Sequence, residues 1–110
     1  MSNWTDICSV TDFLPNAGRC ALFEGEQVAI FRISSKGSDA WFALSNYDPC
    51  SGANVISRGI VGSQGEHLVV ASPVYKQHFR LDTGECLEEA GVSLKTWPVR
   101  VEGERVQLAS

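Results

Sequence analysis

Apolar and polar residues alternate over short stretches of this chain, and clusters that contain glycine separate the stretches. Residues 20–23 (CALF) and 27–33 (QVAIFRI) are rich in β-branched and aromatic side chains, which favour strands. Glu24-Gly25-Glu26 between them is typical of a tight hairpin turn. The pattern therefore predicts an antiparallel hairpin over residues 20–33.

The C-terminal end repeats this signature. Residues 97–101 (WPVRV) and 105–109 (RVQLA) alternate apolar and polar side chains, and Glu102-Gly103 lies between them. A second hairpin is expected there, with its turn at this Glu-Gly pair.

Further strands are expected in the middle of the chain, at residues 40–46, 66–74 and 78–88. The cluster at residues 36–39 predicts a turn before the first, Pro73 interrupts the second, and Asp82-Thr83-Gly84 predicts a turn within the third. Helical signals are limited to one turn within residues 9–18 and another within 57–60. Short strands with turns about every 8–12 residues predict an all-β fold, a small sandwich or barrel of short antiparallel strands with long loops and little helix.

Residues 46–65 form the longest expected connection, with Asn46, Asp48, Pro49 and several glycines. Long connections in compact domains tend to carry function. This segment is therefore the first place to look for a site.

The chain has 110 residues, of which 44% are hydrophobic and 20% charged, and we expect one domain over residues 1–110. The net charge is −4 and the Lys and Arg residues form no basic run, so no nucleic-acid partner is expected. The first ten residues lack the features of a secretion signal. No apolar run approaches the roughly 20 residues that span a bilayer. We therefore expect a cytoplasmic chain with no membrane partner.

The cysteines are Cys8, Cys20, Cys50 and Cys86, and no two of them have a CxxC spacing. In a reducing cytoplasm they are not expected to form disulfides. Cys8, Cys20 and Cys86 lie in or beside strand-like segments and are expected to be small buried side chains. Cys50 differs because it lies in a loop, after Pro49.

Two loops carry a resemblance to a known family. NYDPCSGANV (46–55) and SPVYKQHFRLDTGEC (72–86) resemble the loops of Rieske iron–sulfur domains, N-x-C-P-H-x-G-A and C-P-x-H-G-x-x-F-x-L-x-T-G. The resemblance extends over nearly the whole chain. The residues that match the family frame are Asn46, Pro49, Gly52, Ala53, Pro73, Phe79, Leu81, Thr83 and Gly84.

The cluster ligands of that family do not match. The Cys and His of the first loop fall on Asp48 and Cys50, and those of the second loop fall on Ser72 and Tyr75. Lys76 replaces the glycine that follows the second histidine. A Rieske [2Fe–2S] centre needs two thiolates on one iron and two imidazoles on the other. Of these residues only Cys50 offers a soft donor, so we expect no cofactor and no metal in this chain. His67 and His78 lack the loop spacing and are expected at a strand entry and on a solvent-facing strand.

A narrower resemblance points to a Rieske-like branch without these ligands. Three stretches are similar to the small subunits of assimilatory NAD(P)H-dependent nitrite reductases: W-x-x-I-C, G-x-x-A-L-F-x-G-E-Q-V-A-I-F-R, and residues 46 to 62. The resemblance implies an accessory subunit, inactive alone, that binds a catalytic large subunit. FAD, a [4Fe–4S] cluster and sirohaem are then expected on the large subunit.

The loops are expected to form a tip whose apolar and aromatic side chains replace the metal bonds. In that hypothesis the residues that pack the loops together are Tyr47, Pro49, Cys50, Pro73 and Tyr75. The same tip is a candidate docking site for the large subunit, with Arg58 and Lys76 as charged contacts. The residues predicted for docking are Tyr47, Pro49, Arg58, Pro73, Tyr75 and Lys76.

Other functions stay open at this point. A Rieske-type [2Fe–2S] electron carrier with non-standard ligands is one alternative. A free-standing regulatory or ligand-binding module on the same scaffold is another, since one fold hosts many functions.

Overall fold

The structure is a computed structural model that describes residues 3–35, 37–74 and 76–110. Short strands make up most of it. In chain order the elements are β1 (Thr5–Ser9), the 3₁₀ turn η1 (Val10–Asp12), β2 (Ala17–Phe23), β3 (Glu26–Ser35), β4 (Ser38–Ser45), β5 (Tyr47–Asp48), β6 (Ala53–Asn54), the 3₁₀ turn η2 (Ile56–Arg58), β7 (Ile60–Gln64), β8 (His67–Ala71), β9 (His78–Arg80), β10 (Thr96–Trp97), β11 (Val99–Glu102) and β12 (Arg105–Leu108).

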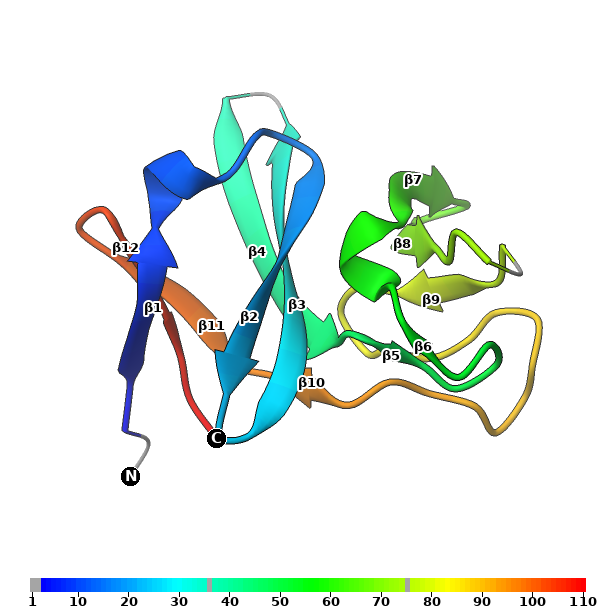
Figure 1. Cartoon of the computed structure of the whole chain (residues 1–110). Helices are drawn as coiled ribbons and strands as arrows, with labels where there is room; N and C mark the ends of the chain where they lie inside the picture. The colour runs from blue at the N-terminus through cyan, green and yellow to red at the C-terminus, as the bar shows by residue number, and fades with distance from the viewer. Residues whose placement is uncertain (1–2, 36, 75) are drawn as a thin grey trace.

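The strands form antiparallel sheets in layers. A four-stranded sheet of order β10-β4-β3-β2 stands in the middle, as Figure 1 shows, with β1-β12-β11 on one side and β5 to β9 on the other. The latter group contains the sheet β7-β8-β9 and the small β5-β6 ladder. The predicted all-β fold with little helix is confirmed. Within the described ranges, no helix has the length and apolarity needed to cross a membrane.

β3 is buried on both of its faces. Alternate strand residues point to opposite sides of a sheet. Ala29, Phe31 and Ile33 enter the core shared with β8 and β9, whereas Val28 and Ile30 enter the core shared with β12. This two-sided burial explains why residues 27–33 are almost continuously apolar.

Both predicted hairpins are confirmed, with small shifts at their turns. In the first, Phe23 pairs with Glu26, and Glu24 and Gly25 make the turn with φ of 51° and 80°. Glu26 therefore already belongs to β3. In the second, Glu102 pairs with Arg105, so the turn residues follow Glu102 rather than include it.

The helical turns also lie close to their predicted places, at η1 and η2. The turn expected over residues 36–39 includes Lys36, which lies outside the described residues. β4 begins within that segment, at Ser38.

Residues 46–65 contain more regular secondary structure than the long connection that the sequence predicted. It contains β5, β6, η2 and β7, and β7 pairs with β8 over its whole length. The expected strand return after Asp82-Thr83-Gly84 is shorter than predicted. Within residues 78–93, all of which the structure describes, the return forms an isolated bridge between Phe79 and Cys86, and a second bridge joins Glu85 to Ser93.

The four cysteines are free thiols. Cys86 is buried as predicted and Cys8 is half-buried, but the prediction for Cys20 is wrong because that side chain is exposed. Cys20 lies on β2, the edge strand of its sheet, where fewer elements cover a side chain. Its sulfur instead accepts a hydrogen bond from the Asn46 amide at 3.5 Å.

Candidate functional site: the two loops

Asn46 fixes both ends of the first loop. Its side chain is 2% exposed, and its amide nitrogen donates to Gln27 Oε1 at 3.1 Å and to the carbonyl oxygen of Asn54 at 3.2 Å. Its Oδ1 accepts the backbone N–H of Ser57 at 2.7 Å. A buried amide with this many partners acts as a structural anchor. This frame residue therefore holds the loop in place.

The first loop turns around Asp48. This residue lies in β5 opposite Ala53, and its side chain is fully buried. Its Oδ1 accepts the Cys50 backbone N–H at 2.9 Å, and its backbone carbonyl accepts the N–H of Gly52 at 2.8 Å. Gly52 has φ of 75°, a conformation that glycine adopts without strain. One carboxylate oxygen of Asp48 is thereby bonded within its own loop, and Oδ2 is left for a partner outside it.

The second loop joins β8 to β9 and turns around Ser72. Its backbone N–H donates to the carbonyl of Gln77 at 2.9 Å, and its own carbonyl accepts the N–H of Lys76 at 3.0 Å. The Ser72 side chain is buried, and its hydroxyl oxygen accepts the Val74 N–H at 3.4 Å. Lys76 adopts φ of 60°, at the position where the Rieske frame has glycine.

The loops meet through these two residues. The hydroxyl of Ser72 donates to Oδ2 of Asp48 at 2.5 Å, and both side chains are buried. These are the positions that match the two cysteines of a Rieske site, which hold one iron between them. A carboxylate–hydroxyl hydrogen bond therefore joins the loops at the point where a metal bridge would otherwise join them.

Electrostatics match this arrangement. Burial by itself raises the pKa of Asp48, but hydrogen bonds from Ser72 and from the backbone N–H of Cys50 outweigh it and hold that pKa below its usual value. Asp48 is therefore ionised at neutral pH. Burial and the neighbouring Asp48 carboxylate raise the pKa of the Cys50 thiol. A thiol with a raised pKa is a poorer metal ligand, because the thiolate is the binding form.

The residues present do not match the ligand set of a [2Fe–2S] centre. Two of the candidate ligand atoms are oxygens that already share the hydrogen bond from Ser72 to Asp48. The Cys50 thiol, whose pKa is raised, lies where the family has an imidazole. The fourth position, Tyr75, lies outside the described residues. Within the described part of the chain, no three His, Cys, Asp or Glu side chains gather as a metal-binding group.

The expected packing of the loops is wrong for three residues. Tyr47 is 48% exposed, and Pro49 and Pro73 are exposed as well. The short buried pair Asp48–Ser72 brings the loops together, so that the neighbouring rings point outward. Cys50 is the exception, since it packs against the core that contains Phe79. Tyr75 was part of the same prediction and is not described.

Two features of this end of the molecule were not predicted from the sequence. Ile60 is 78% exposed, although an isoleucine at a strand start gives no local sign of exposure. His78 is half-buried rather than solvent-facing, and Glu88 contacts it twice: its carboxylate accepts the His78 backbone N–H at 2.8 Å and lies 2.7 Å from Nδ1. The ten-residue separation between them follows no regular spacing.

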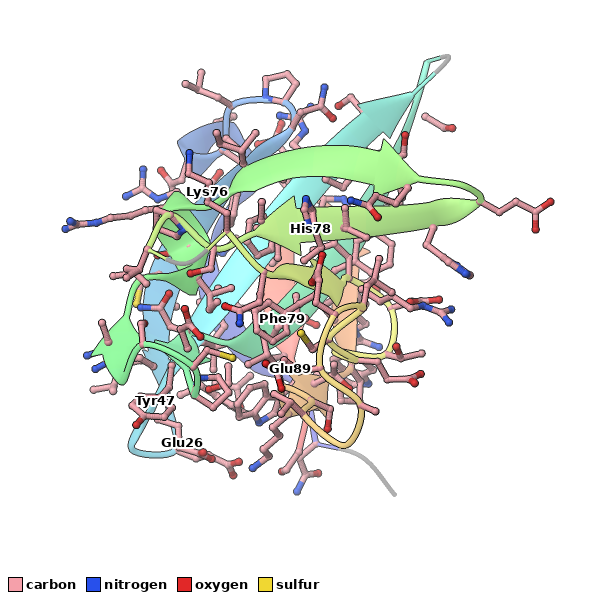
Figure 2. The ribbon with its side chains drawn as sticks, turned by 90° about the vertical axis from the view of Figure 1, so that its right-hand side faces the viewer. Glu26, Tyr47, Lys76, His78, Phe79 and Glu89 are labelled. Atoms are coloured by element: carbon pink, nitrogen blue, oxygen red, sulfur yellow. The ribbon has the colours of Figure 1, made fainter. Side chains whose placement is uncertain are left out.

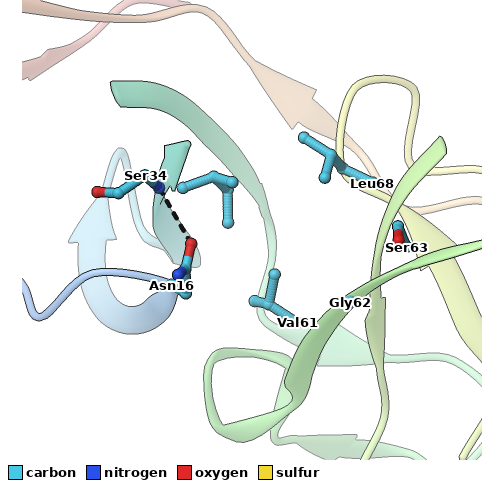
Figure 3. A pocket seen from close by; sticks show the side chains of 7 residues that line it. Asn16, Ser34, Val61, Gly62, Ser63 and Leu68 are labelled. Carbon is cyan, nitrogen blue, oxygen red and sulfur yellow. Dashed lines mark hydrogen bonds between the residues drawn. The ribbon is translucent and has the colours of Figure 1, made fainter. Parts of the chain in front are cut away.

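A separate cavity of about 310 Å³ lies between β3 and the β7–β8 hairpin and is open to solvent (Figure 3). There Asn16 Oδ1 accepts the backbone N–H of Ser34 at 3.0 Å. All of the lining residues are uncharged: Asn16, Ile33, Ser34, Val61, Gly62, Ser63 and Leu68. Among the described residues, the cavity therefore offers no acidic, basic or metal-ligating side chain.

Comparison with known proteins defines the family. A family model described as a Rieske-like [2Fe-2S] domain matches residues 3–109. The nitrite reductase (NADH) small subunit of Salmonella typhimurium is 49% identical over 108 residues, which is 98% of each chain. The NMR structure of the Escherichia coli protein NirD has a TM-score of 0.90 and 47% identity, covering 100% of this chain and 98% of that one.

A larger protein contains a related segment. The nitrite reductase [NAD(P)H] large subunit of Klebsiella oxytoca is 38% identical over 103 residues, which is 94% of this chain and 10% of that protein. Because it matches small subunits over almost their whole length, and because it has the Rieske-like fold described above, this chain belongs to the nitrite reductase (NADH) small-subunit family.

Proposed function

We propose that the chain is the accessory small subunit of a cytoplasmic NAD(P)H nitrite reductase, which reduces nitrite to ammonium in nitrate assimilation. In this proposal the chain binds the catalytic large subunit and carries no cluster. The observation that supports it best is the buried Asp48–Ser72 hydrogen bond, which occupies the cysteine positions of the Rieske frame. FAD, the [4Fe–4S] cluster and sirohaem are expected on the large subunit.

The Klebsiella oxytoca protein supports the choice of partner. There a segment related to this chain is part of the same polypeptide as a large subunit. Covalent linkage keeps two domains close together, and a separate chain needs a binding surface to reach the same arrangement. The predicted contact residues are Tyr47, Pro49, Arg58, Pro73 and Lys76, together with Tyr75, which lies outside the described residues.

The cluster-free state can be tested directly. The chain is purified without oxygen, its visible absorption is recorded, and iron and acid-labile sulfide are measured. We expect a colourless, iron-free, folded protein. Stoichiometric iron and sulfide would favour the alternative, a Rieske-type [2Fe–2S] electron carrier with non-standard ligands. The description of the matching family as a [2Fe-2S] domain supports that alternative.

The accessory role needs a second experiment. NADH- or NADPH-dependent nitrite reduction is measured with the large subunit, with this chain, and with both. We expect no activity from this chain alone, and co-elution of the two chains in gel filtration. Turnover by this chain alone, or separate elution, contradicts the proposal.

A further inference from the structure

Two exposed apolar side chains lie at the end of the molecule that carries the loops. Ile60, the first residue of β7, is 78% exposed and pairs directly with Ala71 of β8. Val74 is 46% exposed and lies in the turn that follows Ala71. The start of β7 and the turn after β8 thus both present exposed apolar side chains at the same end of the β7-β8-β9 sheet. Neighbouring exposed apolar residues with charged residues beside them mark interaction sites.

Basic side chains flank this apolar pair. Arg58 ends η2, two residues before Ile60, and Lys76 lies in the β8–β9 turn; both are exposed. Across the described residues, neither of them forms a salt bridge. By contrast, His78 and Arg80 of β9 face carboxylates, those of Glu88 and Asp82.

The whole chain carries a net charge of −4, whereas Arg58 and Lys76 place two cations, without a salt bridge among the described residues, beside this apolar pair. Figure 2 shows Lys76 and His78 on the side of the molecule formed by β7 to β9. A partner that matches this surface therefore presents negative charge.

The backbone at Lys76 supports a role beyond folding. Its φ of 60° lies in the left-handed region, which costs a residue with a side chain about 1–2 kcal/mol. Glycine would adopt the same conformation without this cost. Strain of this kind is concentrated at functional sites. Lysine rather than glycine at this position therefore places a cationic side chain in the β8–β9 turn at a conformational cost.

We propose that Arg58, Ile60, Val74 and Lys76, which we call the Ile60 surface, dock on the catalytic large subunit. The complementary site is an apolar recess that receives Ile60 and Val74 and has carboxylates at its rim for the two cations. This inference rests on the proposed function, because the large subunit is the partner. It moves the centre of the contact from the rings of Tyr47 and Pro49 to β7 and the β8–β9 turn.

The test measures binding of the full chain to the purified large subunit of the same organism by biolayer interferometry, with thermal unfolding as a check on each variant. The variants are Ile60→Glu and the double charge reversal Arg58→Glu with Lys76→Glu. Leu22→Glu is the matched control, since Leu22 is 72% exposed but lies on β2, in the central sheet. Because Ile60 and Leu22 both point into solvent, neither change is expected to unfold the chain.

We expect Ile60→Glu and the double reversal each to raise Kd by about tenfold or more, as for central interface residues, and Leu22→Glu to stay within about twofold of the wild type. Wild-type binding should also weaken with added salt. Unchanged Kd for both surface variants, or equal losses for Leu22→Glu, overturns the Ile60 surface while the accessory role stands. A wild-type chain that does not bind the large subunit overturns both.

Discussion

Asp48 accepts a hydrogen bond of 2.5 Å from the Ser72 hydroxyl, and the two residues, 24 positions apart, come from different loops. Both side chains are buried, so water cannot replace either partner. The bond ties the β5–β6 ladder to the β8–β9 turn. In a Rieske domain an iron ion would join the same two positions.

The first prediction concerns this bond. Ser72→Ala leaves the buried Asp48 carboxylate with one donor fewer and should lower the free energy of unfolding by about 1–3 kcal/mol. Urea unfolding followed by far-UV circular dichroism measures the loss. Ser63→Ala, at an exposed serine of β7, is the control and should stay within about 0.5 kcal/mol of the wild type. Equal stability of the two variants would show that the Asp48–Ser72 bond contributes little.

The second prediction concerns pH. The pKa of Asp48 is lower in the folded chain than its usual value, so the ionised carboxylate stabilises the fold. That contribution is complete above the unfolded pKa of about 3.9 and is lost as the pH falls through the lower folded value. Asp48→Asn, which keeps one acceptor oxygen, lacks this contribution at every pH.

We therefore expect Asp48→Asn to be less stable than the wild type at neutral pH, and the difference to shrink as the pH falls below about 4. Urea midpoints at several pH values measure it. The pKa values of Asp39, Asp82 and Glu88 are lowered too, but these groups act equally in both proteins and cancel in the comparison. A difference that stays constant with pH contradicts the assignment to the Asp48 charge.

The third prediction concerns Gly84. Its φ is +80°, and a Cβ atom there would lie 2.1 Å from the carbonyl oxygen of Leu94. The Leu94 N–H also donates to the Gly84 carbonyl at 2.8 Å, so neither backbone can move away freely. Gly84→Ala should cost about 3 kcal/mol or more by thermal or urea unfolding.

Gly91→Ala is the matched control for Gly84. Gly91 has φ of +84° but no atom within 4 Å of the added Cβ. It should cost only the backbone strain, about 1–2 kcal/mol. Similar losses at both glycines would mean that the contact with Leu94 does not matter.

The fourth prediction concerns Lys76. Lys76→Gly removes the backbone strain of the left-handed conformation but raises the conformational entropy of the unfolded chain. The net effect should be a gain of about 0.5–1 kcal/mol in the free energy of unfolding. Lys76→Ala keeps the strain and should not stabilise the chain. Chemical denaturation of both variants under the same conditions measures the difference in their free energies of unfolding. A Lys76→Gly chain no more stable than Lys76→Ala argues against strain at this turn.

Elements that depend on residues close together in the chain were predictable from the amino-acid sequence. The hairpins of residues 20–33 and 97–109 follow from alternation and from turn residues a few positions apart, and the structure confirms both. The Rieske resemblance also located the loops and showed that Asp48, Cys50 and Ser72 replace ligands. These are properties of adjacent residues, which a linear pattern records.

The contacts of these residues could be known only from the folded chain. Nothing local indicates that the Asp48 carboxylate accepts a hydrogen bond from the Ser72 hydroxyl, that Tyr47 is exposed, or that Ile60 is uncovered. Cys20 was expected to be buried, but its exposure depends on the position of β2 at the edge of its sheet, which the sequence does not reveal. Burial and long-range hydrogen bonds are set by segments that meet only after folding, and no pattern of neighbouring residues contains them.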